Sequence, residues 1–161
     1  MKFKEMDLTT AQEISQWVYS EPYSIYNMDT TDEAIEELLN GFHFALHSTV
    51  DDIIGYYCIG KSAQVPAGHR YHVYDNTECL DLGLGLHPNL TGSGLGLSFV
   101  KSIIKDVKKS YPLYGIRLTV ALFNQRAITV YKKAGFEEGV LFSRKNTDGR
   151  MEFMTMFLKE K

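Results

Sequence analysis

The segment Leu80–Lys109 constrains the fold of this chain more than any other part of its sequence. Leucine alternates with Asp81 and two glycines over Leu80–Leu86, which is the period of a β-strand with one apolar face. Because glycine weakens a strand, the two glycines indicate that another backbone or a ligand packs closely on the opposite face. A glycine-rich stretch, Thr91–Gly96, follows, and apolar residues then recur at helical spacing through Val107. The sequence therefore predicts a strand, a glycine-rich loop and a helix in direct succession.

The glycine-rich stretch is suited to binding phosphate. A helix N-terminus presents unpaired N–H groups and about half a positive charge, and glycines let an anion approach those donors. A Rossmann dinucleotide site also begins in this way, but it starts with the first strand and has an acidic residue at the end of the second parallel strand. Here the loop follows several strands, no such acidic residue comes at the expected interval, and no Walker lysine is present.

Strands and helices alternate along the rest of the chain. We expect strands at 3–6, 42–47, 53–59, 116–122, 136–144 and 151–158, and helices at 11–18, 30–39 and 124–134. Thr9 or Thr10 is expected to cap the first of these helices, and Asn124 the last. Residues 63–77 fit no class of secondary structure.

The bulk composition is that of an ordinary globular domain. The chain has 161 residues, of which 44% are hydrophobic and 23% charged, and we expect one domain over residues 1–161. No run approaches the roughly 18 apolar residues of a membrane span, and no secretory signal is evident, so we expect a cytoplasmic location and no membrane partner. Cys58 and Cys79 form no CxxC pair, which predicts reduced thiols and no structural metal.

Charge is distributed unevenly between the two halves of the chain. Residues 1–80 contain 4 Lys and Arg against 13 Asp and Glu, a net charge of −9, whereas residues 81–161 contain 13 against 7, a net charge of +6. The second half therefore favours an anionic ligand and the first half a cationic one, although a scattered solvated surface could produce the same counts. Nothing indicates a nucleic-acid partner, and the sequence leaves both a monomer and a homodimer open.

A second motif lies one strand beyond the glycine-rich loop. It consists of Asn124-x-x-Ala127-x-x-x-Tyr131-x-x-x-Gly135-Phe136. Together with Thr91-x-x-Gly94-x-Gly96 after a strand, it resembles the two central motifs of the GNAT acetyltransferase superfamily, and the order of elements along the whole chain is similar to that of this family. The resemblance departs at Thr91, where the family usually has Arg or Gln, but the backbone donors of the loop do not depend on that side chain.

The resemblance implies a fold and an activity. The expected fold is of the α/β (α+β) class, with a mixed, largely antiparallel sheet of about seven strands. Helices cover both faces of that sheet, and its two central strands splay apart in a V. The expected activity is acetyl-CoA-dependent N-acetyl transfer to an amine, by direct attack of the amine on the thioester.

The resemblance also implies which residues contact acetyl-CoA. The pantetheine would pair with backbone near Leu84 and Leu86, and the pyrophosphate would lie on the loop amides. Asn124 and Ala127 would border the pantetheine, and Lys132 or Lys133 the nucleotide end. The implied cofactor-binding set is Leu84, Leu86, Thr91, Gly92, Ser93, Gly94, Leu95, Gly96, Asn124, Ala127, Tyr131 and Lys133.

Tyr131 matches the tyrosine that protonates the departing thiolate in the family, although a core tyrosine is the alternative. A base is also needed, because an amine with a pKa near 10.4 is mostly protonated at neutral pH. Asp81 is favoured since it shares the glycine face, Glu78 is the alternative, and a structural hydrogen-bonding role for Asp81 also stays open. His43, His47, His72 and His87 are weaker candidates. Covalent catalysis through Cys58 or Cys79 would need a neighbouring base that the sequence does not reveal.

The acceptor site is expected to involve the region after the first helix. Trp17, Tyr19, Tyr23 and Tyr26 fall where the family forms one wall of this site, although aromatic residues there can equally serve packing. The acidic first half favours a cationic small-molecule or peptide amine. Two rival interpretations are a non-catalytic acyl-CoA-binding sensor or scaffold domain of the same fold and a nucleotide-binding regulatory domain.

Overall fold

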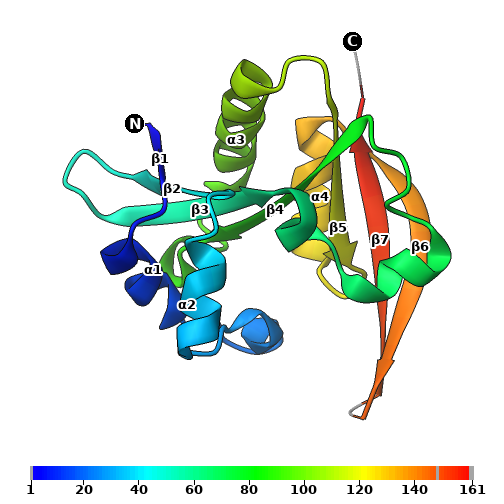
Figure 1. The fold of residues 1–161 in the computed structure, drawn as a ribbon, viewed down its shortest axis with the longest axis horizontal. Helices are drawn as coiled ribbons and strands as arrows, with labels where there is room; N and C mark the ends of the chain where they lie inside the picture. Colours follow the sequence, from blue (N-terminus) through cyan, green and yellow to red (C-terminus); the bar gives the residue numbers. More distant parts are fainter. Residues whose placement is uncertain (1, 148, 160–161) are drawn as a thin grey trace. The chain divides into compact units, whose positions relative to one another are not determined.

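The computed structural model describes residues 2–147 and 149–159, and Figure 1 shows their alternating strands and helices. The strands are β1 (Phe3–Glu5), β2 (His43–His47), β3 (Ile53–Ile59), β4 (Cys79–Leu86), β5 (Gly115–Ala121), β6 (Phe136–Asn146) and β7 (Gly149–Leu158). The α-helices are α1 (Leu8–Ser15), α2 (Asp32–Leu38), α3 (Gly96–Ser110) and α4 (Gln125–Ala134). Short 3-10 helices are η1 (Tyr23–Tyr26), η2 (Gly60–Ala63), η3 (Pro66–Tyr71) and η4 (Pro88–Leu90).

The seven strands form one sheet in the order β1-β2-β3-β4-β5-β7-β6. The β1–β2, β2–β3, β5–β7 and β6–β7 pairs are antiparallel, and the β4–β5 pair is parallel. This arrangement confirms the predicted mixed α/β class and the largely antiparallel sheet of seven strands.

The chain divides into two compact units. The N-terminal unit comprises the residues up to Cys58 together with Leu84–Leu95, and the C-terminal unit comprises Ile59–Gly83 and the residues from Gly96 onward. Strand β4 therefore contributes its first part to the C-terminal unit and its last three residues to the N-terminal unit. The single domain over residues 1–161 stays a prediction.

In the N-terminal unit, two capped helices pack on the β1–β2–β3 meander. The α1 cap is Asp7, whose Oδ1 accepts a hydrogen bond from Thr10 N at 2.8 Å, so the predicted caps Thr9 and Thr10 were wrong. The helix also ends at Ser15 instead of residue 18, because Trp17 N already bonds to Ile14 O in a terminal turn. The core of this unit comprises Met6, Ala11, Ile14, Trp17, Leu38, Ala45 and Ile53.

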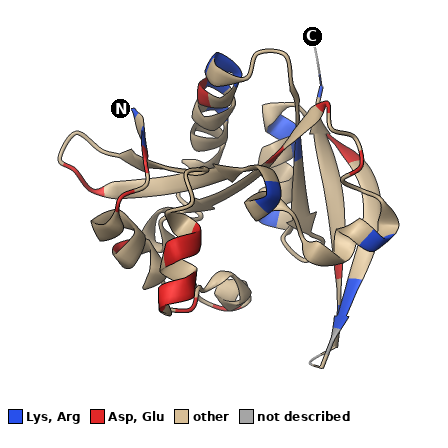
Figure 2. Cartoon of the chain, viewed as in Figure 1, with Lys and Arg blue, Asp and Glu red and all other residues tan. Residues whose placement is uncertain are grey.

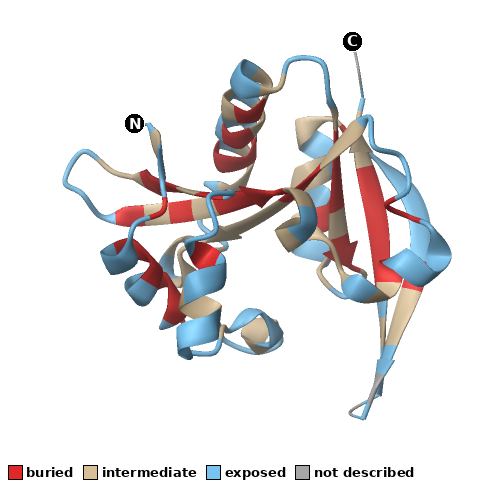
Figure 3. Cartoon of the chain, viewed as in Figure 1, coloured by how far each residue is buried: buried red, intermediate tan, exposed pale blue. Residues whose placement is uncertain are grey.

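In the C-terminal unit, the parallel register pairs Cys79–Leu82 with Gly115–Leu118. Helix α3 buries Phe99, Val100, Ile103 and Val107, the face that its periodicity predicted, and Figure 3 shows this buried stripe. A second core cluster comprises Val73, Tyr74, Ala121, Phe142 and Phe153. None of the helices among the described residues combines the length and apolar character needed to cross a membrane.

The segment that fitted no class in the sequence contains η3 and is fixed by Tyr74. The Tyr74 hydroxyl accepts a hydrogen bond from Val65 N at 2.9 Å and lies 2.8 Å from Thr119 Oγ1 on β5. Burial is the main cause that raises the pKa of Tyr74, so the phenol stays neutral and can make both contacts. A side chain thus ties this irregular segment to the sheet.

Gly85 on β4 is one of the two glycines that predicted a close approach. A Cβ atom at this position would lie 2.5 Å from Cε1 of Tyr56, which is on β3 of the same unit. The close neighbour at Gly85 is therefore an aromatic side chain. Burial raises the pKa of Tyr56 above its ordinary value, consistent with a ring enclosed by protein.

Gly85→Ala should lower the free energy of unfolding by about 1–3 kcal/mol, because the added methyl overpacks against the Tyr56 ring. Urea unfolding would measure the loss. In a Tyr56→Ala background the same substitution should cost much less, because the obstructing ring is gone. An equal cost in both backgrounds would contradict the contact.

Candidate functional site

The glycine-rich loop has a backbone that only glycine adopts easily at two positions. Gly92 and Gly94 have φ values of 74° and 85°, and both residues are exposed. The Thr91 hydroxyl donates to the Pro88 carbonyl at 2.8 Å, and the Ser93 hydroxyl donates to the Leu90 carbonyl. Since these hydroxyl protons are used inside the loop, an anion here would depend on backbone N–H donors.

Helix α3 begins at Gly96, directly after the loop. Its 15 residues align peptide dipoles toward the loop end, and its first turn contains no acidic residue that would repel an anion. A Cβ atom at Gly96 would lie 3.4 Å from Val130 Cγ2, so a larger residue here would press on α4. The first turn of α3 is thereby held close to α4 within the C-terminal unit.

The C-terminal end of β4 is held by aromatic residues of the N-terminal unit. The Tyr19 hydroxyl donates to the Leu86 carbonyl at 2.7 Å, and burial raises the pKa of Tyr19 to about 12. The rings of Trp17 and His87 have centroids 4.9 Å apart, and His87 N donates to Ile54 O at 2.8 Å. Tyr19, one of the aromatic residues singled out in the sequence, thus contacts the strand end expected to pair with pantetheine.

The other predicted acceptor-site aromatics differ in exposure. Trp17 is 8% exposed and belongs to the core of the N-terminal unit, which favours a packing role. Tyr23 and Tyr26 lie in η1, where Tyr23 is half-buried and Tyr26 is 40% exposed. Tyr19 N donates to Asn27 Oδ1 at 2.7 Å, so the residue that follows η1 is hydrogen-bonded to the segment that follows α1. The geometry leaves Tyr23 and Tyr26 as the more accessible candidates.

In the C-terminal unit, Asp81 forms a buried ion pair. Its Oδ1 accepts from Arg117 Nε at 2.6 Å, its Oδ2 accepts from Arg117 Nη2 at 2.9 Å, and Gln64 Nε2 donates to Oδ2 at 2.8 Å. Asp81 is 4% exposed and Arg117 2%. Burial lowers the pKa of Arg117, but its hydrogen bonds and attraction to Asp81 outweigh that effect and raise the pKa overall. With both oxygens occupied, the geometry favours the structural alternative for Asp81 over the role of a general base.

Arg117 and Gln64 were not predicted from the sequence. A signal for Arg117 was present, since a single charged residue in the apolar strand Ile116–Leu122 needs a buried partner. Its guanidinium also lies over the Tyr74 ring, with Cζ 5.3 Å from the ring centroid. No comparable signal identified Gln64, because it lies in the segment that fitted no class.

Glu78, the alternative base, lies one residue before β4 begins. Its side chain is exposed, its N–H donates to Asn76 Oδ1 at 2.9 Å, and its carbonyl accepts from Gly115 N at 2.9 Å. The backbone of Glu78 is therefore fixed while its carboxylate faces solvent. The neighbouring Cys79 is a half-buried free thiol, and Cys58 is a buried one in the other unit.

Helix α4 carries the second motif. Asn124 caps it, with Oδ1 accepting from Ala127 N at 3.1 Å, and Gly135 ends it with φ 109°. Tyr131 is half-buried and its ring lies edge-on to Phe136, with centroids 6.0 Å apart. Lys133 is exposed. The five motif residues thus have local roles in starting, packing or ending one short helix.

Asp81→Asn should lower the free energy of unfolding by about 3–5 kcal/mol, because it leaves the buried Arg117 charge without a counter-charge. Chemical denaturation would measure this loss. The matched control is Lys132→Ala, which breaks the exposed 3.2 Å pair with Glu138 and should cost less than about 1 kcal/mol. Similar losses in the two variants would argue against a structural role for the buried pair.

Comparison with solved structures shows a shared fold. A variant of spermidine N-acetyltransferase SpeG from Vibrio cholerae superposes with a TM-score of 0.70 and 14% identity, over 98% of this chain and 94% of that one. A GNAT-family acetyltransferase from Bacillus anthracis gives 0.73 and 13%, over 97% and 92%. A ribosomal-protein-S18-alanine N-acetyltransferase from Escherichia coli gives 0.62 and 19%, over 98% and 92%.

Sequence comparison gives the family. No curated protein matches the chain. Residues 8–136, however, match the sequence profile of the acetyltransferase (GNAT) family, and this range includes both motifs. Because the match spans most of the chain, the chain belongs to the acetyltransferase (GNAT) family.

Proposed function

We propose that this protein transfers an acetyl group from acetyl-CoA to a cationic amine. The observation that carries the proposal is the exposed loop with left-handed Gly92 and Gly94, which leads directly into α3. Such a loop, followed by a helix whose first turn lacks acidic residues, favours a diphosphate. Membership of the GNAT family supports acetyl-CoA as the ligand that contains this diphosphate.

The remaining cofactor contacts are assigned by the family resemblance. Leu84 and Leu86 would offer backbone to the pantetheine, and Asn124 and Ala127 would border it. The Asn124 side chain is already engaged in the α4 cap, so its part toward the cofactor would be to fix the start of that helix. Lys133 is exposed, so its ammonium would be available to a phosphate at the nucleotide end.

Acetyl-CoA supplies the activated acyl group and a thiolate leaving group. On this chain, Tyr131 would hold the proton that the departing sulfur needs, since a phenol and a thiol have comparable pKa values. A carboxylate or a water chain would take the proton of the attacking amine. We assign this task to Glu78 ahead of Asp81, because the Asp81 carboxylate is buried and accepts three hydrogen bonds from Arg117 and Gln64 while that of Glu78 is exposed.

The charge of the N-terminal unit supports a cationic acceptor. Helix α2 carries Asp32, Glu33, Glu36 and Glu37 on its exposed surface, and Figure 2 shows this acidic helix. The Vibrio cholerae protein of similar fold is a spermidine N-acetyltransferase, and spermidine is a cationic amine. A polyamine or a lysine-like amine therefore fits best among acceptors.

The function is tested by measuring free thiol released from acetyl-CoA in the presence of spermidine, an aminoglycoside and a lysine peptide. Amine-dependent thiol release supports the transferase. Saturable CoA binding with no thiol release from any amine would instead support a non-catalytic acyl-CoA-binding domain. Competition of ATP or NAD with acetyl-CoA would favour a nucleotide-binding domain.

Tyr131→Phe should reduce kcat by about 100-fold or more, because general acid catalysis contributes on that scale, while KM for acetyl-CoA changes little. Steady-state kinetics with thiol detection would show the split. Tyr114→Phe serves as the control, since Tyr114 is an exposed residue before β5 and should leave both constants unchanged. Unchanged turnover in Tyr131→Phe would remove Tyr131 from the proposed role.

Gly94→Asp should weaken CoA binding at least about 10-fold, because a carboxylate would repel the diphosphate at the loop. Gly94→Asn is the matched control, with the same size and the same left-handed backbone but no charge. Calorimetric titration with CoA should show a much smaller loss for the Asn variant. Equal binding by both variants would place the phosphates elsewhere.

A further inference from the structure

A cavity of about 450 Å³ lies in the C-terminal unit between η3 and β6. Such a volume is within the range of about 300–1,000 Å³ that is typical of small-molecule sites. Its polar lining comprises Arg70, Tyr71, Ser143, Arg144 and Lys145. The cavity is thus built by two elements of one unit and uses none of the residues assigned above to acetyl-CoA or catalysis.

The lining of this cavity is strongly basic. Arg70, Arg144 and Lys145 contribute three positive charges, and none of the described residues that line the cavity is acidic. Within the described part of the chain, none of the three has an ion-pair partner, whereas Arg150, further along the same hairpin, lies 3.5 Å from Glu152. Figure 2 shows basic residues on η3 and along the β6–β7 hairpin. The uncompensated charge favours an anion in the cavity.

Arg144 lacks an oxygen acceptor among the described residues. Its Nε is buried without a hydrogen-bond partner, its Cζ lies 5.3 Å from the Phe153 ring centroid, and its Nη2 reaches only the Met151 sulfur at 4.0 Å. A guanidinium has five N–H donors in a planar fork that matches carboxylate and phosphate. The aromatic contact therefore holds the group in place without using its hydrogen-bonding capacity.

Two hydroxyl groups complete the lining. Tyr71 Oη and Ser143 Oγ lie 3.5 Å apart, one on each of the two elements that enclose the cavity. Each can donate a proton to an oxygen of a ligand. We propose that this cavity binds the oxyanion group, phosphate or carboxylate, of a small molecule, held by Arg70, Arg144 and Lys145 with hydroxyl donors from Tyr71 and Ser143.

The test is ¹H–¹⁵N NMR on the whole chain, titrated separately with inorganic phosphate and with succinate against sodium chloride of matched ionic strength. The Nε–H signal of Arg144 and the amides of residues 67–71 and 143–145 should shift saturably with at least one anion. The double variant Arg70→Gln/Lys145→Gln should weaken that binding about 10-fold or more, on the scale of lost charge-assisted hydrogen bonds. Binding of phosphate, of succinate or of both identifies the kind of anion.

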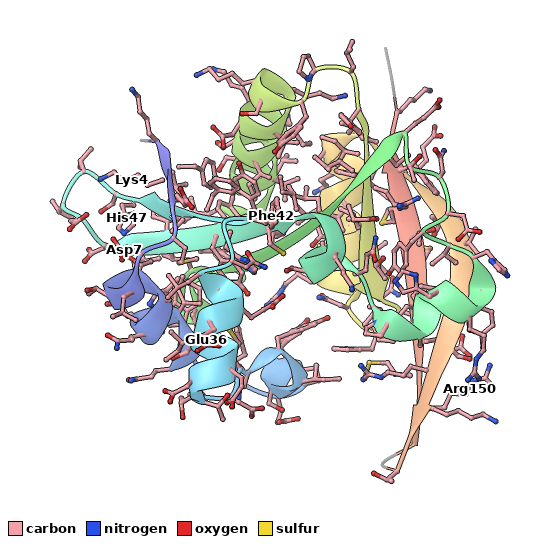
Figure 4. All side chains as sticks on the ribbon, viewed as in Figure 1. Lys4, Asp7, Glu36, Phe42, His47 and Arg150 are labelled. Carbon is pink, nitrogen blue, oxygen red and sulfur yellow. The ribbon has the colours of Figure 1, made fainter. Side chains whose placement is uncertain are left out.

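Arg150→Gln is the matched control, because it removes a cation from the same hairpin outside the cavity; Arg150 is labelled in Figure 4. It should leave anion binding unchanged. An absence of saturable shifts, an equal loss in Arg150→Gln, or binding of an RNA oligomer through these residues with neither small anion would each overturn the proposal.

Repeating the titration with CoA at saturation separates this inference from the proposed function. Shifts confined to the glycine-rich loop, and lost when CoA is added, would overturn the cavity as an anion site while supporting the loop as a phosphate site. Shifts at Arg144 in a protein that fails to bind CoA would support the cavity and count against the acetyltransferase activity.

Discussion

The buried ion pair between Asp81 and Arg117 is the interaction on which the C-terminal unit most depends. It joins β4 to β5, a parallel strand pair, through partners 36 residues apart in sequence. The same two residues also contact the irregular segment before β4. Gln64 donates to the Asp81 carboxylate, and the Arg117 guanidinium lies over the Tyr74 ring. Removing either charge would leave the other buried without compensation, so strand register and loop position are stabilised together.

This pair also changes how the chemistry is assigned. A carboxylate on the central strand is an attractive general base when only the sequence is known, but a base must have a lone pair available to the incoming proton. At Asp81 three donors already occupy both oxygens, whereas Glu78, three residues earlier, has a fixed backbone and an exposed carboxylate. Asp81, the carboxylate favoured as the base from the sequence, is thus better explained by its structural ion pair with Arg117.

The basic residues of the second half of the chain differ in whether a carboxylate neutralises them. Arg117 and Lys132 are paired with carboxylates, whereas Arg144 and Lys145 join Arg70 around one cavity whose lining, over the part of the chain that the structure describes, contains no acidic residue. Net charge by itself could not distinguish a solvated surface from a site. The distinction comes from pairing, because a compensated cation contributes little potential to its surroundings and an uncompensated cluster contributes much.

The sequence alone determined the features that depend on short-range physics. The strand–loop–helix segment, the Asn124 cap, the Gly135 stop and the buried face of α3 follow from side-chain period, capping and left-handed glycine, all of which act within a few residues. Only the tertiary structure decided the partner of Asp81, the ring of Tyr56 against Gly85, the anchoring of the η3 segment by Tyr74 and the basic cavity. These features join residues from separate elements, and local pattern carries no information about which distant side chain will fill a given space or neutralise a given charge.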